Sequence, residues 1–166
     1  EWLGSDVETI AIEKCGIARD GCACVVADSA APVSVSTELQ RIGACEVRAL
    51  RDYGFADKYF ASLKAGLIAW SLPAGILPLN AAAGLRALEA SGVGVTEELV
   101  AAGMKRLVLN GRREALRLGN IDIVLDVAHN PDAAVELRKF LECQTAAQPT
   151  TAIFAVMSDK DCRDMI

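Results

Sequence analysis

The sequence is poor in the residue patterns that build zinc sites and nucleic-acid surfaces. It has a single histidine among 166 residues, and its six cysteines include no Cys-x-x-Cys pair. This spacing disfavours a zinc site and is typical of reduced, structural thiols in a cytoplasmic protein. There are 17 Lys and Arg against 22 Asp and Glu, with no basic cluster, and the net charge is -5. Nucleic acid is therefore not expected as a partner.

A membrane span and a phosphate-binding loop are missing as well. Residues 65–85 are uncharged, but Pro73 and Pro78 interrupt them. We therefore expect a buried strand or turn that leads into a core helix, and no membrane partner. The sequence contains no G-x-x-x-x-G-K-[ST] motif, so no loop of this type is present to bind ATP phosphates through backbone amides. Hydrophobic residues make up 52% of the chain, which is ample for a core.

The remaining pattern alternates strands and helices, which predicts the α/β class. Residues 22–27 and 45–50 predict two short strands on either side of a helix at 36–42, and this order is typical of parallel pairing. Residues 51–60 fit either an irregular loop or the edge of a hairpin. Further helices are expected from a Ser5 cap to Gly16 or Gly21, at 80–90, and at 97–107 behind a Thr96 cap.

Residues 110–113 break the helical pattern and predict a junction between two domains, 1–109 and 110–166. Beyond the junction we expect a strand at 121–126, a helix at 131–142 and a strand at 151–156. Such a β-α-β unit forms a right-handed parallel crossover. The helix start is well marked, because Asn130 is a favourable N-cap and Pro131 suits the first helical position.

The only histidine lies on the turn between that strand and that helix, in the segment Asp126-Val127-Ala128-His129-Asn130-Pro131. In open α/β sheets, ligands bind beyond the carboxyl ends of the strands. Asp126 and His129 are therefore candidate site residues. Two simpler roles remain open: Asp126 capping the turn, and His129 bonding to nearby backbone carbonyls.

Five short motifs, the first of them in two parts, occur in a fixed order along the chain, and each is weak alone. They are Glu1-Trp2-Leu3-Gly4 with Glu13-Lys14-Cys15-Gly16-Ile17, then Pro78-Leu79-Asn80-Ala81-Ala82, Gly111-Arg112, the Asp126 to Pro131 segment, and Asp159-Lys160-Asp161. Together they resemble the folylpolyglutamate synthase/dihydrofolate synthase family, within the Mur ligase superfamily. The resemblance implies the rear portion of a central ATPase domain over 1–109, followed by the first β-α-β part of a Rossmann-like C-terminal ligase domain over 110–166.

The resemblance also implies an activity and the residues that serve it. Such an enzyme joins L-glutamate to dihydropteroate or a folate through an acyl phosphate, uses ATP and magnesium, and is expected as a cytoplasmic monomer. Lys14 and His129 would be catalytic, with Lys14 ligating magnesium as a carbamate, a hard oxygen ligand. Asn80, Arg112 and Asp126 would contact ATP. Structural roles stay open here too: a solvent-facing helix lysine, an N-cap at Asn80 and a linker charge at Arg112.

The sequence also departs from the family. Arg113 stands where the family usually has an aromatic residue, and Asn110 where it often has proline. The family's phosphate loop and its other magnesium ligands would lie upstream of Glu1, so we expect an internal fragment that is inactive alone. The alternatives are a fragment of a peptidoglycan-type Mur ligase, although those usually have tyrosine at the position of Val127, and a non-catalytic truncated remnant.

Overall fold

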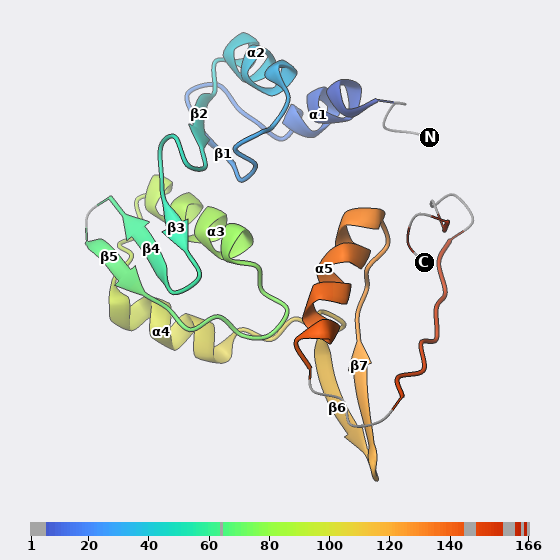
Figure 1. Ribbon diagram of the computed structural model, residues 1–166. Coiled ribbons are helices and arrows are strands. Elements are labelled where there is room, and N and C mark those ends of the chain that lie inside the picture. The colour runs from blue at the N-terminus through green and yellow to red at the C-terminus, as the bar shows by residue number, and fades with distance from the viewer. Residues whose placement is uncertain (1–5, 64, 145–148, 158–161, 164, 166) are drawn as a thin grey trace. The chain divides into compact units, whose positions relative to one another are not determined.

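The computed structural model describes residues 6–63, 65–144, 149–157, 162, 163 and 165. The chain divides into two compact units, Glu1–Val108 and Leu109–Ile166 (Figure 1). The domain boundary expected from the sequence, after residue 109, differs from this division by one residue. No helix in the described ranges is both long enough and apolar enough to cross a membrane.

The first unit begins with two helices that alternate with two parallel strands. Its elements are α1 (Val7–Cys15), β1 (Ala23–Val26), α2 (Val33–Ile42) and β2 (Cys45–Arg48). Ala23 pairs with Cys45 in a parallel ladder, which confirms the predicted pairing around a crossover helix. Leu39 of α2 is fully buried against α1. Gly43 ends α2 as predicted, because it adopts a left-handed conformation with φ +82.

The cap of α1 differs from the prediction. Asp6, and not Ser5, is the N-cap: its Oδ1 accepts from the Thr9 N–H at 2.9 Å, and its Oδ2 accepts from the Thr9 hydroxyl at 2.8 Å. These hydrogen bonds, the backbone one first, lower the pKa of the Asp6 carboxyl. A charged acceptor at this end also suits the helix dipole, which explains why aspartate takes the cap. Ser5 lies outside the described residues.

The rest of the first unit is a small antiparallel sheet with two helices. The strands are β3 (Phe55–Ala56), β4 (Tyr59–Ser62) and β5 (Gly66–Ala69), and the helices are α3 (Pro78–Ala90) and α4 (Glu97–Arg106). Residues 51–60 thus contain a hairpin edge. Thr96 caps α4 as predicted, accepting from the Leu99 N–H at 3.3 Å. Asn80 is not a cap, since α3 begins two residues earlier at Pro78. Phe60 and Ile68 are completely enclosed in the core between sheet and helices.

The described residues of the second unit form one hairpin and one helix. Its elements are β6 (Glu114–Leu118), β7 (Ile121–Leu125) and α5 (Pro131–Glu142). β6 and β7 are antiparallel, with Leu118 opposite Ile121, and Gly119 turns the chain at φ +61. The start of α5 is as predicted: Asn130 caps it, accepting from the Ala133 N–H at 2.8 Å, and Pro131 is its first residue.

The β-α-β crossover expected in this unit is not found. Among the described residues, β7 pairs only with β6, an antiparallel strand that was not predicted, and residues 151–156 form no strand. A hairpin closes through a short local turn, whereas a parallel pair depends on a distant segment. Most residues of β7 are exposed, and α5 has no buried residue.

Candidate functional site

Two short segments of the second unit are joined by main-chain hydrogen bonds. Residues 111–113 precede β6, and residues 126–129 follow β7. The Val127 N–H donates to the Gly111 carbonyl at 2.8 Å, and the Arg113 N–H donates to Oδ2 of Asp126 at 3.0 Å. The Gly-Arg and Asp-Val-Ala-His motifs, distant in sequence, therefore lie side by side. We call these two segments together the junction turn.

Asp126 organises the junction turn. One carboxylate oxygen accepts from Arg113, and the other, Oδ1, accepts from the Ala128 N–H at 2.7 Å. Both oxygens thus bind main-chain donors, and the residue is half-buried. This is the capping role that the sequence allowed for Asp126. Any contact of Asp126 with a nucleotide would be additional to it.

Gly111 is required where the two segments touch. Its φ is +68, a region that favours glycine, and its N–H donates to a Glu114 carboxylate oxygen at 2.7 Å. A Cβ atom at this position would lie 2.9 Å from Cγ1 of Val127. Only a residue without a side chain lets the segments approach this closely.

Arg112 and His129 are the exposed polar side chains of the junction turn. His129 Nδ1 lies 3.0 Å from the Val127 carbonyl, so the tautomer that carries a proton on Nδ1 donates to it and leaves Nε2 as an acceptor. No other residue in the described part of the chain bonds to the Arg112 guanidinium. The structure thus holds a fork of cationic donors and an imidazole on two adjoining segments.

Arg113 differs sharply from the arginine before it. Its side chain is only 18% exposed, and Nη2 donates to the main-chain carbonyl of Glu136 at 3.2 Å and lies 3.6 Å from the Glu136 carboxylate. Its guanidinium carbon stands 5.4 Å from the ring centre of Phe140. Sequence reasoning noted Arg113 only as a departure from an aromatic position. The signal that it missed is the i, i+4 spacing of Glu136 and Phe140, which puts a carboxylate and a ring on one face of α5.

Lys14 and Asn80, the other predicted site residues, belong to the first unit. Lys14 is exposed in the last turn of α1, and Asn80 is exposed in the first turn of α3. α1 packs on α2, whereas α3 packs on β1 and the three-stranded sheet, so the two residues belong to different layers of this unit. The structure therefore brings together Arg112, Asp126 and His129 within the second unit. Asp159 and Lys160 lie outside the described residues.

A metal site is not completed by the side chains that can be described. No group of three or more His, Cys, Asp and Glu able to hold a metal ion occurs in the described ranges. Lys14, as a carbamate, would supply one oxygen ligand. A magnesium ion needs several oxygen ligands in octahedral order, so it would depend on further ligands.

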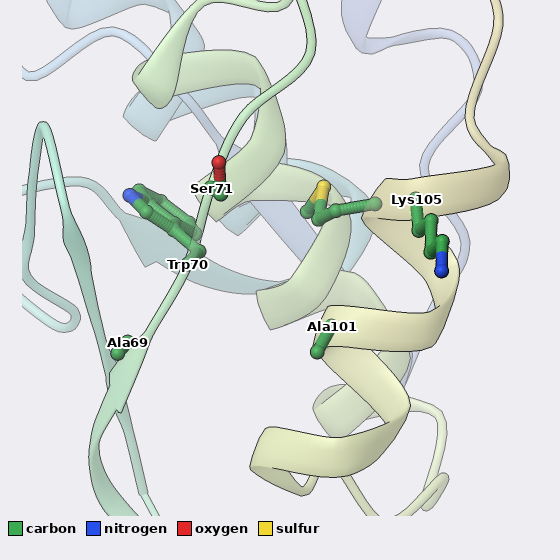
Figure 2. Close-up of a pocket in the computed structure, with 6 residues that line it drawn as sticks. Ala69, Trp70, Ser71, Ala101 and Lys105 are labelled. Carbon is green, nitrogen blue, oxygen red and sulfur yellow. The ribbon is translucent and has the colours of Figure 1, made fainter.

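The first unit has a shallow hollow of about 530 Å³ beside α4 (Figure 2). Its lining consists of Ala69, Trp70, Ser71, Ala101, Met104 and Lys105. The indole N–H of Trp70 already donates to the Asp57 carbonyl at 2.8 Å. The hollow contains none of the predicted site residues, and it offers a mostly apolar contact with one hydroxyl and one amine.

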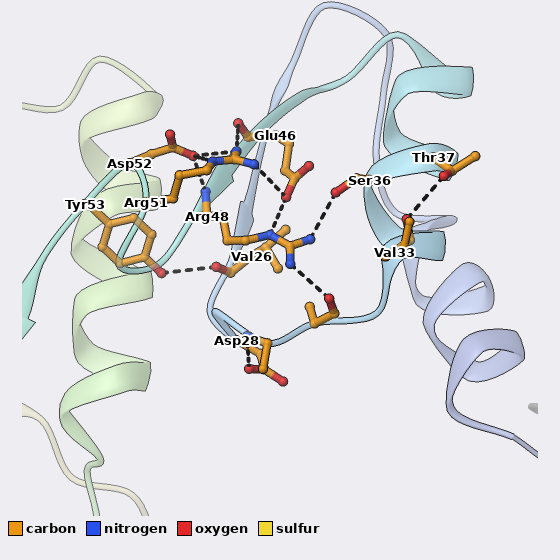
Figure 3. Close-up of polar contacts among 12 residues, drawn as sticks. Val26, Asp28, Val33, Ser36, Thr37, Glu46, Arg48, Arg51, Asp52 and Tyr53 are labelled. Carbon is orange, nitrogen blue, oxygen red and sulfur yellow. Dashed lines mark hydrogen bonds and ion pairs between the residues drawn. The ribbon is translucent and has the colours of Figure 1, made fainter.

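The first unit also contains a dense polar network, which Figure 3 shows around Arg48 of β2. Arg48 donates to Glu46 at 2.6 Å, to the Ala31 carbonyl at 2.9 Å and to the Ser36 hydroxyl at 3.1 Å. Although burial raises the pKa of Glu46, the hydrogen bonds from Ser36 and Arg48 outweigh it and the pKa is lowered. Every nitrogen of the Arg48 guanidinium has a partner, so this network fixes β2 to the loop before α2 and leaves no cationic group free.

Comparison with known proteins supports the resemblance seen in the sequence. The family model described as dihydrofolate synthetase, C-terminal domain, matches residues 110–166. Over 97% of this chain, the sequence is 32% identical to the dihydrofolate synthase/folylpolyglutamate synthase of Escherichia coli K12. The chain spans 39% of the length of that relative.

The comparison with solved structures points to the same family as the comparison of sequences. The FolC protein of E. coli in complex with DHPP and ADP matches with a TM-score of 0.76 and 31% identity, over 91% of this chain and 36% of that chain. The bifunctional enzyme of Yersinia pestis complexed with AMPPNP and Mn matches with a TM-score of 0.76 and 30% identity, over 86% of this chain and 35% of that chain. The α/β fold is that of these Mur-ligase-type enzymes, and the chain belongs to the folylpolyglutamate synthase/dihydrofolate synthase family.

Proposed function

We propose that this chain is the part of an ATP-dependent ligase that presents Arg112 and His129 to the nucleotide, in an enzyme that adds L-glutamate to dihydropteroate or a folate. The observation that carries the proposal is the junction turn, in which main-chain bonds leave these two side chains exposed on adjoining segments. The names of the relatives, and the ADP and AMPPNP in their structures, support the substrate class. ATP is therefore the proposed nucleotide.

The proposed reaction has two steps. The γ-phosphoryl group of ATP passes to a carboxylate oxygen of the pterin substrate and ADP leaves. The glutamate amine then attacks the acyl carbon, the new C–N bond forms, inorganic phosphate leaves and the amine loses a proton. Such chemistry depends on positioning and charge stabilisation, without a protein nucleophile.

Three side chains of the junction turn have roles that their geometry allows. The Arg112 guanidinium, which has no partner within the described structure, binds phosphate oxygens through its charge and its forked donors. His129 keeps one ring nitrogen on the Val127 carbonyl and orients the nucleotide through the other. Asp126 holds both segments through its two main-chain bonds, and any contact of its own with ATP would be a secondary one.

The first unit would correspond to the central ATP-binding domain and the second to the C-terminal ligase domain. Asn80 lies in the first turn of α3 and would contact the base or ribose of ATP. Lys14 would ligate magnesium as a carbamate, and the bound ion would neutralise phosphate charge. Since the described residues contain no group of three or more His, Cys, Asp and Glu able to hold a metal ion, the remaining ligands would have to come from elsewhere.

The test replaces the matched segment of the E. coli relative with this chain and measures glutamate-dependent ADP release with dihydropteroate or tetrahydrofolate. We expect a folded chimera to turn over. Arg112→Ala should lower its kcat/KM about tenfold or more, the worth of one hydrogen bond to a charged group. Arg117→Ala, at an exposed arginine of the hairpin that follows Arg112, is the control. A folded chimera without turnover, or equal effects of the two substitutions, would contradict the proposal.

The 166 residues alone should not release ADP, because their sequence contains no phosphate loop. The assay is the same, with the purified chain replacing the chimera. ADP release that depends on both folate and glutamate would show this expectation to be wrong.

A further inference from the structure

The backbone at Arg113 adopts a conformation that needs outside support. Its φ is +49, which is disfavoured for every residue with a Cβ. The main-chain N–H of Arg113 is bound to Asp126, immediately before the turn that contains His129. The backbone of Arg113 is therefore held by a residue that precedes His129 in the sequence.

The side chain of Arg113 makes a second set of contacts, with residues that follow His129. The Arg113 guanidinium contacts Glu136 and Phe140 of α5, the helix that begins directly after His129. Arg113 thus touches the chain on both sides of the histidine, through its backbone before it and its side chain after it. This is a bridge that constrains where the imidazole stands relative to residues 111–113.

Because of these contacts, the Arg113 guanidinium is not available to bind a ligand. Its guanidinium donates to the Glu136 carbonyl and lies 3.6 Å from the Glu136 carboxylate, which also pairs with Lys139 at 2.6 Å, and most of its surface is covered. Arg112, one residue earlier, is exposed and has no such partner in the described ranges. The two adjacent arginines therefore differ in role: Arg113 contacts α5 of its own unit, whereas Arg112 is free to contact a ligand.

We infer that Arg113 is a positioning residue, which bridges the junction turn to α5 and so holds Arg112 and His129 in register toward the phosphates of a bound nucleotide. This inference rests on the proposed function for its ligand, and on the bridge itself for its geometry.

The experiment uses the 166-residue chain labelled for NMR, with ADP as the probe. His129 is the only histidine, so its ring gives one set of resonances. Arg113→Met keeps an apolar stem and removes the guanidinium. Arg117→Met makes the same change at an arginine of β6 that is 68% exposed, and is the matched control. Hydrogen exchange of the Val127 and Ala128 amides reports whether the junction turn is closed.

In Arg113→Met we expect the Val127 and Ala128 amides to exchange faster and ADP to bind about tenfold more weakly, as expected when one charged-group contact is misplaced. A direct ionic contact of Arg113 with phosphate would weaken ADP binding and leave the exchange of both amides unchanged, and that result would overturn the inference. Unchanged amide exchange, or unchanged ADP affinity with faster exchange, would overturn it too.

A second variant covers the case in which Arg113→Met unfolds the second unit. Phe140→Leu removes the ring under the guanidinium and keeps the charge, and should give a smaller change in the same direction. No change in either measurement for Phe140→Leu would then count against the bridge. Failure of the proposed function is distinct, because it appears in the unsubstituted chain as a His129 resonance that does not respond to ADP, while amide exchange still tests the bridge.

Discussion

Arg113 and Asp126 stand thirteen positions apart in sequence, yet the N–H of one donates to the carboxylate of the other at 3.0 Å. The hairpin between them explains this contact. Glu114, the first residue of β6, pairs with Leu125, the last residue of β7, so the chain enters and leaves the hairpin at the same end. The antiparallel strands thereby place the Gly-Arg motif against the motif that contains the histidine.

Removing the Asp126 carboxylate should open this contact. Asp126→Ala leaves the N–H groups of Arg113 and Ala128 without acceptors, which should lower the free energy of unfolding of the second unit by about 1 to 3 kcal/mol. Asp126→Asn keeps one oxygen and should cost less. The measurement is urea unfolding followed by the His129 ring resonances. If alanine and asparagine cost the same, the carboxylate does not hold two donors.

Gly111 and Gly119 form a matched pair for separating backbone strain from close packing. Both have positive φ, +68 and +61, but a Cβ meets Val127 at 2.9 Å only in Gly111→Ala, whereas none of the described atoms lies within 4 Å in Gly119→Ala. Gly119→Ala should cost about 1 kcal/mol from strain alone. Gly111→Ala should cost about 1 to 3 kcal/mol more, because the neighbouring segment must move.

The same unfolding assay compares the two glycine variants. A further check is the exchange of the Val127 amide, which should speed up in Gly111→Ala and stay unchanged in Gly119→Ala. Equal unfolding free energies for both variants would show that the segments are not in close contact.

Elements with local signals were predictable from the sequence. α5 begins at Pro131 because an asparagine cap and a proline fix its first turn, and α2 ends where Gly43 takes up a left-handed conformation. The parallel pair β1 and β2 followed from a strand-helix-strand order. These features depend on a few neighbouring residues, whose preferences are visible in the sequence.

Features that depend on a distant partner were not predictable in the same way. β6 has five residues with two charges, and its identity as a strand comes from pairing with β7. Residues 151–156 carry the apolar run of a strand, but the pattern cannot say whether a partner receives it. In the candidate site, motifs pointed to Arg112, Asp126 and His129, while the contact of Arg113 with Glu136 spans 23 residues and left no motif.

Acid should lower the free energy of unfolding of the first unit, partly because it protonates Asp52. The hydrogen bond from Arg51, followed by the Arg48 N–H, lowers the pKa of the Asp52 carboxyl below its ordinary value of 3.8 (Figure 3). A lowered pKa in the folded state adds stability above the pKa of the unfolded chain, and this stability is lost as the pH falls through the folded value. Because the side chain is 34% exposed and solvent screens it, we expect less than about 1 kcal/mol.

Asp52→Asn should therefore reduce the loss of stability as the pH falls from about 5 to about 2, a window that contains the ordinary pKa of an aspartate. The readout is urea unfolding followed by Trp70 fluorescence, with Trp2→Phe removing the other indole. Asp57→Asn is the control, since its carboxylate makes no hydrogen bond within the described structure. The interpretation fails if both variants keep the acid sensitivity of the parent.

The two helix caps test whether the units unfold separately. Asn130 accepts from the Ala133 N–H at 2.8 Å in the second unit, and Thr96 accepts from the Leu99 N–H at 3.3 Å in the first. Asn130→Ala should cost about 1 kcal/mol, and Thr96→Ala about half of that because its hydrogen bond is longer. If each unit is its own cooperative structure, Asn130→Ala shifts the transition seen by the His129 ring and leaves that of Trp70 unchanged, and Thr96→Ala does the reverse. A shift of both transitions by one substitution would mean that the chain unfolds as a single body, since a lost cap can spread its cost only through contacts that the two units share.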